Sequence, residues 1–309
     1  MIKYIKNICI FFVIVAIIDV AFGKVCFYLN SHAKGGDTQR HYHIAKGCNE
    51  DILIFGSSRA CHHYIPALLS DSLNVSAYNC GVDGNGILLF YSYMKMILGY
   101  HTPKVVIYDI CSGFDMEKDD FTKYLRWQKR FYNEPGVSEV FNDVSPMEKH
   151  KMLSSLYRYN GDWIQMLSDN ISPKELVLDG GYKPIYRNMD YEPETQEAET
   201  KPTLWDETKK KFFKKLYSMC RERNVTFIVA YSPLYKASSS IQFQEMTQFC
   251  QENNIPLWDY YTNPCFSLNR DYFADTSHMN DKGAQEYTKM IAQKLKSENI
   301  LRYRKLVEE

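Results

Sequence analysis

The sequence predicts an α/β fold, a three-layer α/β/α sandwich with a mainly parallel sheet. Short apolar runs occur at residues 51–55, 104–110 and 225–230, with Gly or Pro nearby. The segments between them carry apolar residues at helical spacing. Strands that are apolar on both faces are typical of a parallel sheet covered by helices on each side.

Weaker signals add two strands and define the covering helices. Residues 75–78 and 255–258 could each supply a short strand. Apolar residues share one face of two predicted helices: Phe212, Phe213, Leu216, Met219 and Cys220 in the first, and Ala284, Tyr287, Ile291 and Leu295 in the second.

The N-terminal segment predicts a membrane signal-anchor at residues 1–23. Lys3 and Lys6 precede the run ICIFFVIVAIIDVAF, which only Asp19 interrupts. Positive residues stay in the cytoplasm, so we expect a single-pass protein of the cytoplasmic membrane. Its C-terminal domain would be extracytoplasmic, or periplasmic in a Gram-negative cell. A cleaved secretory signal is the alternative, because residues 21–23 resemble a small-x-small site.

The remaining chain is predicted to be a juxtamembrane linker at 24–50 and one catalytic domain at 51–309. Residues 116–201 interrupt the strand-helix rhythm, contain helical stretches within 145–167 and end in an acidic run. Such an insertion beside the strand ends could be a lid or a substrate-binding element. A surface insertion without function is equally open.

Charge and cysteine usage exclude several classes of function. The 37 acidic and 37 basic residues balance, which disfavours a nucleic-acid partner. The nine cysteines include no C-x-x-C pair and no zinc-ligand spacing, so we predict no metal, no cofactor and no specific disulfide. Four in apolar contexts are expected to be buried free thiols: Cys61, Cys80, Cys111 and Cys220.

Two segments far apart in the chain carry candidate chemistry. Ser57 and Ser58 follow Gly56 at the end of the first strand, where a hydroxyl would lie beside the N–H groups of a following helix. Asp275 and His278 lie three residues apart near the last helix and could activate a serine. The alternatives are helix caps for the serines, and a turn residue with a surface histidine for the pair.

These motifs together resemble the SGNH (GDSL-like) hydrolases. A strand followed by Gly-x-Ser, a glycine block at residues 79–84 and a C-terminal Asp-x-x-His is that family's layout. The resemblance implies Ser58 as nucleophile and Asp275 and His278 as its acid and base. It also implies that the N–H groups of Ser58 and Gly84 form part of an oxyanion hole.

Two departures from the family pattern refine the resemblance. Ser57 replaces the usual Asp before the nucleophile, as in the membrane-anchored branch related to teichoic-acid D-alanylation and exopolysaccharide acetylation proteins. Residues 109–115 lack the asparagine of the family's third block, so one oxyanion donor is unassigned. Asn85 is the nearest substitute, although it could simply favour its glycine turn.

Other polar residues are predicted to have structural roles. His62 and His63 lie one turn after Ser58, where helix geometry keeps them from the hydroxyl, and packing or solvent exposure is expected for both. The lysines between Lys209 and Lys215 are expected on the solvated face of an amphipathic helix.

The resemblance implies an extracytoplasmic serine esterase or O-acyltransferase that acts on carbohydrate-linked esters, such as acetyl esters. Its expected partners are the membrane, through the N-terminal helix, and the carbohydrate or acyl-ester substrate. The alternative is a catalytically inactive scaffold that binds or assembles envelope polysaccharide. The sequence names no protein partner.

Overall fold

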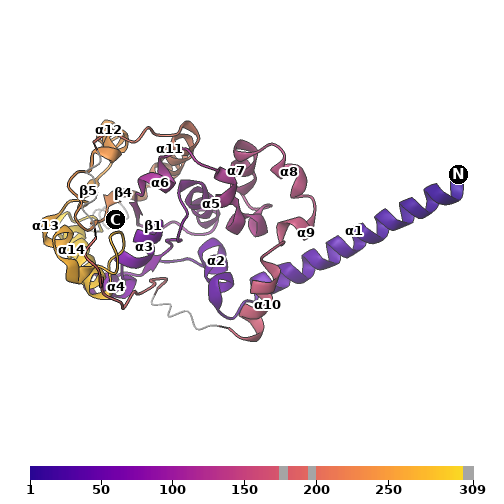
Figure 1. The fold of residues 1–309 in the computed structure, drawn as a ribbon, viewed down its shortest axis with the longest axis horizontal. Coiled ribbons are helices and arrows are strands. Elements are labelled where there is room, and N and C mark those ends of the chain that lie inside the picture. The colour runs from indigo at the N-terminus through magenta and orange to yellow at the C-terminus, as the bar shows by residue number, and fades with distance from the viewer. Residues whose placement is uncertain (174–179, 194–199, 302–309) are drawn as a thin grey trace, which may run out of the picture. The chain divides into compact units, whose positions relative to one another are not determined.

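The computed structural model describes residues 1–173, 180–193 and 200–301 (Figure 1). The chain forms two compact units. The helical unit contains residues 1–47 and 121–176, and the sheet unit contains residues 48–120 and 177–309. The acidic run at 194–199 lies outside the described residues.

A five-stranded parallel sheet forms the centre of the sheet unit, with the order β2-β1-β3-β4-β5. Its strands are β1 (Ile52–Gly56), β2 (Ala77–Asn79), β3 (Val105–Asp109), β4 (Thr226–Tyr231) and β5 (Leu257–Asp259). This confirms the predicted α/β class. The two weakly predicted strands are the short β2 and β5, which lie at the sheet edges and pair on one side only.

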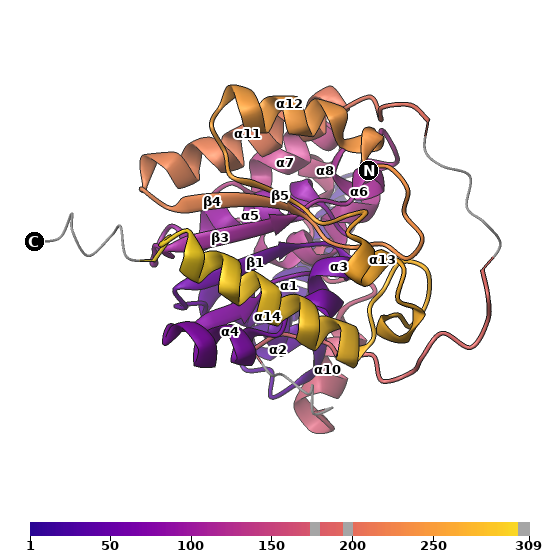
Figure 2. The same cartoon turned by 90° about the vertical axis from the view of Figure 1, so that its left-hand side faces the viewer.

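Helices cover both faces of this sheet (Figure 2). They are α3 (Ser58–His63), α4 (Pro66–Leu73), α5 (Ile87–Ile97), α6 (Ser112–Asp115), α11 (Glu207–Glu222), α12 (Gln244–Glu252), α13 (Pro264–Ser267) and α14 (Asp281–Ser297), with 3₁₀ turns η2 (Ile241–Phe243) and η3 (Arg270–Tyr272). α4 packs with α14, and α5 packs with α11.

Alternating side chains of each strand pack into these two helical layers. Ile54 and Ile107 share a buried cluster with Tyr287 of α14. The next residues along the strands point the other way: the Phe55 ring lies 5.8 Å from Phe90 of α5, and Tyr108 belongs to the same layer. Burial on both faces explains why the strands are continuous apolar runs.

The first turns of α14 and α11 are held by different contacts. The last helix begins at Asp281, and Asn280 caps it by accepting a hydrogen bond from the Gly283 N–H at 3.0 Å. The expected solvated lysine face is wrong for Lys209, whose side chain is fully buried. Its Nζ lies 3.5 Å from Asp119 Oδ1, because the first turn of α11 packs against the segment after β3.

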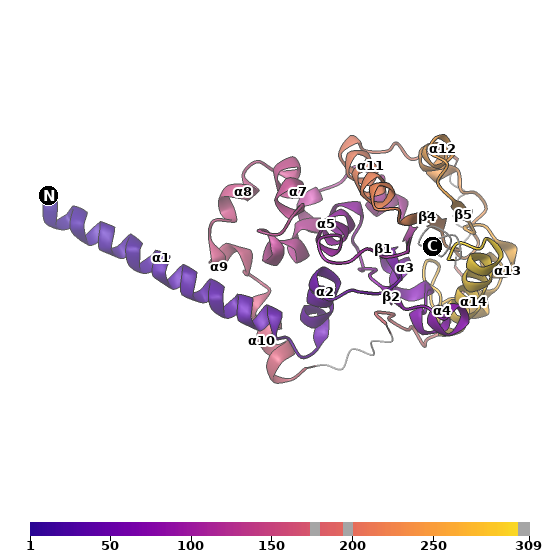
Figure 3. The ribbon, with the colours of Figure 1, turned by 180° about the vertical axis from the view of Figure 1, so that it is seen from behind.

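The helical unit is built from the N-terminal segment and the first part of the expected insertion (Figures 1 and 3). Its elements are α1 (Ile2–Ser31), α2 (Gly36–Lys46), the 3₁₀ segment η1 (Phe121–Phe131), α7 (Val137–Val144), α8 (Glu148–Lys151), α9 (Ser155–Arg158) and α10 (Trp163–Ile171). α1 continues beyond residue 23, and the range expected as a linker is largely helical. Among the described residues, α1 is the one helix long and apolar enough to cross a membrane.

A small core joins the distant pieces of this unit. Cys26 of α1 is buried with Tyr159 and Met166. Arg130 of η1 pairs with Asp162 at 3.0 Å and donates to Asn30 Oδ1 at 3.2 Å. The expected insertion is therefore divided, because residues 121–173 belong to the same unit as α1 and residues 180–193 and 200–201 belong to the sheet unit.

Candidate active site

The carboxyl end of β1 positions Ser58. Gly56 ends the strand with φ of +143°, and a Cβ there would lie 2.5 Å from the Asp109 carbonyl oxygen, so the turn requires glycine. Ser57 follows at the N-cap, but its hydroxyl makes no cap hydrogen bond. Ser58 is the first residue of α3 and is partly exposed. Its N–H lies in the first helical turn, where N–H groups have no intrahelical acceptor.

A tight loop before α14 carries Asp275 and His278. The loop is closed by a bridge between Phe273 and Met279. Inside it, Asp275 Oδ1 accepts hydrogen bonds from the N–H groups of Ser277 and His278, each at 2.9 Å. The carboxylate therefore organises the backbone that presents the imidazole.

Ser58, His278 and Asp275 form a continuous hydrogen-bonded chain. His278 Nε2 lies 2.8 Å from Ser58 Oγ, and His278 Nδ1 lies 2.9 and 3.1 Å from the two Asp275 oxygens. A carboxylate only accepts, so Nδ1 carries the ring proton and Nε2 is free to accept the serine proton. This is the arrangement by which an imidazole activates a hydroxyl.

The groups around Asp275 stabilise its ionised carboxylate. Partial burial raises its pKa, but hydrogen bonds from the His278 ring and the Ser277 N–H outweigh this and bring the pKa to about 2. Arg187 also donates to Asp275 Oδ2 at 3.0 Å. The carboxylate therefore stays ionised at neutral pH and can stabilise an imidazolium.

His63 connects α3 to the Asp275/His278 loop. Its Nε2 accepts a hydrogen bond from the Met279 N–H at 2.9 Å, and its ring is fully buried. Burial lowers its pKa far below the ordinary value, with a further contribution from His278. The neutral ring packs as the sequence predicts, and it also fixes the residue next to His278.

The glycine block lies beside the end of β1. The Val82 N–H donates to the Gly56 carbonyl at 3.0 Å, and buried Asn79 donates to the Ala60 and Tyr64 carbonyls at 2.6 and 2.9 Å. Gly84 takes φ of +65° on the exposed turn. Asn85 Nδ2 donates to the Asp83 carbonyl at 2.9 Å, which supports this turn and leaves its second amide hydrogen for another acceptor.

Residues 109–115, where the family pattern has its third block, contain two buried carboxylates, Asp109 and Asp115. The Asp115 carboxylate accepts from the N–H groups of Ile87 and Cys111 at 2.9 and 2.8 Å, and from the Tyr108 hydroxyl at 2.7 Å. Arg59 is buried nearby and donates to the Ile110 carbonyl. These groups connect β3 to α5 and α3. Among the described residues, none of these groups contacts Ser58 Oγ.

Residues 180–193, which we call the strap, connect the two halves of the site. The Lys183 N–H donates to the Cys61 carbonyl of α3 at 3.1 Å. The Met189 N–H donates to the Phe273 carbonyl at 2.9 Å, at the start of the Asp275/His278 loop. The strap therefore spans from α3, which begins at Ser58, to the Asp275/His278 loop.

His62 has polar partners as well as packing contacts. Its Nδ1 lies 2.7 Å from the Lys183 carbonyl of the strap, and its Nε2 lies 3.1 Å from Asp83 Oδ1. Its ring meets the His278 ring edge to face, with centroids 5.5 Å apart. His62 does not contact the Ser58 hydroxyl, as helix geometry predicted.

Sequence reasoning missed Arg187, the His62–Asp83 pair and the hydrogen bonds of Asn79 to α3. Asn79 begins the glycine block, and a buried asparagine beside a glycine turn is a detectable signal. No sequence signal marks Arg187, because it lies in the expected insertion and its contact with Asp275 depends on how the strap folds over the site.

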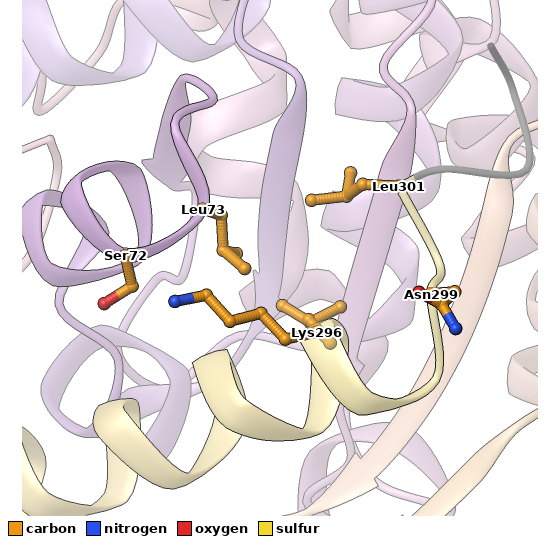
Figure 4. A pocket seen from close by; sticks show the side chains of 6 residues that line it. Ser72, Leu73, Lys296, Asn299 and Leu301 are labelled. Atoms are coloured by element: carbon orange, nitrogen blue, oxygen red, sulfur yellow. The ribbon is translucent and has the colours of Figure 1, made fainter.

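Two cavities of the sheet unit lie on α14. One, of about 340 Å³, is lined by Ser72, Leu73, Leu295, Lys296, Asn299 and Leu301 (Figure 4). It is at the end of α14 opposite His278. The other, of about 350 Å³, is lined by strap residues Tyr182, Pro184 and Tyr186 together with Ile65, Ala67, Leu68, Asp281 and Gln285. Neither lining includes Ser58 or His278.

Solved structures that are similar to this chain include the following two. A protein assigned to the G-D-S-L family of lipolytic proteins from Desulfitobacterium hafniense DCB-2 aligns with a TM-score of 0.41 and 11% identity, over 78% of this chain and 97% of its own. A protein assigned as an acylhydrolase from Bacteroides fragilis NCTC 9343 aligns with a TM-score of 0.39 and 10% identity, over 85% and 96%. No family model and no curated protein matches the chain.

Proposed function

We propose that this protein is a membrane-anchored serine esterase or O-acyltransferase that acts on carbohydrate-linked esters, such as acetyl esters. The observation that carries the proposal is the hydrogen-bonded chain from Ser58 Oγ through His278 to Asp275. Ser58 begins α3, and His278 lies in a loop 220 residues later in the sequence. Packing of the core alone does not require these side chains to meet.

In the first step, His278 Nε2 takes the Ser58 proton while Oγ attacks the ester carbonyl carbon. The carbonyl oxygen becomes an oxyanion, which the N–H groups of Ser58 and Gly84 stabilise, with Asn85 as a further donor. His278 then gives its proton to the leaving alkoxide as the ester C–O bond breaks. The products of this step are the free alcohol and an acyl-serine.

In the second step, His278 takes a proton from an acceptor hydroxyl, which attacks the acyl-serine carbonyl. Collapse of the oxyanion breaks the bond between the acyl carbon and Ser58 Oγ, and His278 returns the proton to Ser58 Oγ. Water as acceptor gives hydrolysis, and a sugar hydroxyl gives transfer. Asp275 stays ionised and stabilises the imidazolium in both steps.

The exposed tyrosines of the strap support a carbohydrate substrate. Tyr186 is 74% exposed, and it is the neighbour in sequence of Arg187, which contacts Asp275. An exposed aromatic ring offers a flat apolar face on which a sugar ring stacks. The partly exposed triad also suits an ester carried on a large molecule, since His278 is 26% exposed.

The activity test offers acetylated oligosaccharide in water, and separately an activated aryl acetate with unacetylated oligosaccharide. Acetate release supports the esterase, and acetyl-oligosaccharide formation supports the transferase. Ser58→Ala abolishes either product. Tyr186→Ala raises KM for the oligosaccharide by about three- to tenfold, the size of an aromatic stacking contribution, and Tyr100→Ala is the control at an exposed tyrosine before β3.

The proposed location depends on α1. Its apolar window has a mean hydropathy of 2.6 and contains no buried residue, and Lys3 and Lys6 lie at the start of α1. We expect the sheet unit to lie outside the cytoplasmic membrane. Protease added to intact spheroplasts should remove a C-terminal epitope, and protection until lysis would contradict this orientation.

A further inference from the structure

The two halves of α1 have different surroundings. Residues 2–18 are exposed along their whole length. From Asp19 onward one face of the helix contacts the helical unit: Phe22 meets the Trp163 ring, with centroids 6.4 Å apart, and Cys26 is buried beside Tyr159. These positions follow helical spacing on one face. Protein contacts along α1 therefore begin at Asp19.

The Asp19 carboxylate joins α1 to the start of α9. It accepts hydrogen bonds from the Ser154 hydroxyl at 2.7 Å and from the N–H groups of Ser155 and Leu156 at 2.8 and 2.9 Å. One turn later, a Cβ on Gly23 would lie 2.3 Å from Ser155 Oγ, so α9 lies directly against the helix. A carboxylate is costly in hydrocarbon, and these donors explain how it is tolerated in an apolar run.

The length of the free half places this contact near the bilayer surface. Residues 2–18 span about 25 Å at 1.5 Å per residue, whereas the hydrocarbon core is about 30 Å thick. This length includes Lys3 and Lys6, whose long side chains reach back to the cytoplasmic headgroups. A membrane span must therefore reach past Asp19 toward Phe22. The surfaces of α9 and α10 that flank these residues then lie at the level of the lipid headgroups.

Those surfaces carry exposed apolar side chains. We define the collar as Leu153, Leu156, Trp163, Ile164 and Leu167. Leu153 and Ile164 are 78% and 61% exposed. A hollow of about 570 Å³ beside α1 is lined by apolar Phe22, Leu156 and Trp163 and by polar Ser154, Tyr157 and Asn160. Figures 1 and 3 show α9 and α10 beside the C-terminal half of α1.

We propose that the collar inserts into the headgroup–acyl boundary of the bilayer that α1 crosses, as a second attachment of the helical unit to lipid. This rests on the proposed membrane anchor. Phospholipid is the occupant because the collar is continuous with the lipid-facing helix, and because Trp and Tyr beside polar groups match the composition of membrane interfaces. A soluble surface rarely groups such large apolar side chains.

The test measures Trp163 fluorescence in full-length protein reconstituted into vesicles with phosphatidylcholine brominated near the headgroup end of its acyl chains. We expect the wild type to be quenched, and Trp163→Phe to lose most of this quenching while Trp127→Phe keeps it. Ile164→Glu and Leu153→Glu should each reduce it by roughly twofold, because a charge lowers insertion at the interface. Leu204→Glu is the control, since Leu204 is 81% exposed in the sheet unit.

Flotation of the same vesicles separates the two proposals. Vesicles that carry the protein but leave Trp163 unquenched would overturn the collar and leave the anchor standing. Protein that does not float with the vesicles, or leaves them at alkaline pH, would overturn the anchor and the collar together. Flotation with Trp163-dependent quenching supports both.

Discussion

The sheet unit and the helical unit bury their residues in different ways. In the sheet unit, continuous apolar strands are covered on both faces, and the polar residues gather where β1 ends and α14 begins. In the helical unit, short helices pack on one end of α1 and leave apolar side chains exposed. Polar residues at the carboxyl ends of parallel strands lie where such sheets place their ligand sites, whereas exposed apolar patches are a feature of surfaces that meet a membrane or another protein.

The largest predicted effect tests the chemistry of the sheet unit. His278→Ala removes the proposed base, and we expect kcat to fall by about 10⁴-fold or more, since residues of a triad act as one unit. The thermal unfolding midpoint should change little, because His278 is partly exposed. Initial rates with an aryl acetate, together with thermal unfolding, measure both quantities. Loss of the fold in this variant would contradict a purely catalytic role.

The next effect should be confined to the helical unit. Gly23→Leu places side-chain atoms where Ser155 lies, and we expect a destabilisation of about 1–3 kcal/mol, as for other overpacked sites. Limited proteolysis should then cleave faster within residues 121–173, while aryl acetate turnover is retained. The matched control is Val25→Leu on the exposed side of α1. Equal cleavage in both variants would show that α9 does not dock on Gly23.

A third prediction concerns pH and His63. Its folded-state pKa lies far below the ordinary 6.5, so below pH 6.5 the unfolded chain binds a proton that the folded chain does not. Stability is therefore present above pH 6.5 and is lost as pH falls, by up to about 1.4 kcal/mol per pH unit. His63→Gln should flatten this slope in denaturant unfolding between pH 7 and 5. An unchanged slope would assign the pH dependence to other groups.

The smallest predicted effect concerns the strap. Arg187 is 69% exposed, and its ion pair with Asp275 is therefore screened by water. We expect Arg187→Gln to lower kcat/KM by less than about fivefold, which corresponds to at most about 1 kcal/mol for an exposed pair. Lys236→Gln, which removes a different exposed pair with strap residue Glu192, serves as the comparison. A loss as large as that of His278→Ala would make Arg187 part of the chemistry.

The sequence predicts the sheet unit well because its signals are local. Apolar runs give the strands, Asn280 gives the start of α14, and glycine at residue 56 marks the turn before Ser58. The tertiary fold brings Ser58 and His278 together, and among the sequence signals only the motif resemblance predicts this contact. The roles of Ser58, His278 and Asp275 stay a prediction until they are tested by mutation.

The helical unit was less predictable because its contacts join distant residues. Hydropathy indicates the apolar part of α1 but not its continuation to Ser31, where Asn30 bonds Arg130. The stretch at 145–167 is helical but broken into short pieces, since α9 begins where Asp19 supplies acceptors for its first N–H groups. The expectation of a solvated Lys209 is wrong for a similar reason: its partner Asp119 lies in a distant segment, which the helical pattern around Lys209 does not reveal.

Covalent labelling tests the central claim most directly. A fluorophosphonate probe should modify the full-length protein at Ser58, as read by mass spectrometry of the labelled peptide. Labelling should be absent in Ser58→Ala, retained in Ser57→Ala and at least about a hundredfold slower in His278→Ala, because the hydroxyl needs its base. Folded wild-type protein that neither reacts with the probe nor turns over any ester would contradict the enzyme and favour the polysaccharide-binding scaffold.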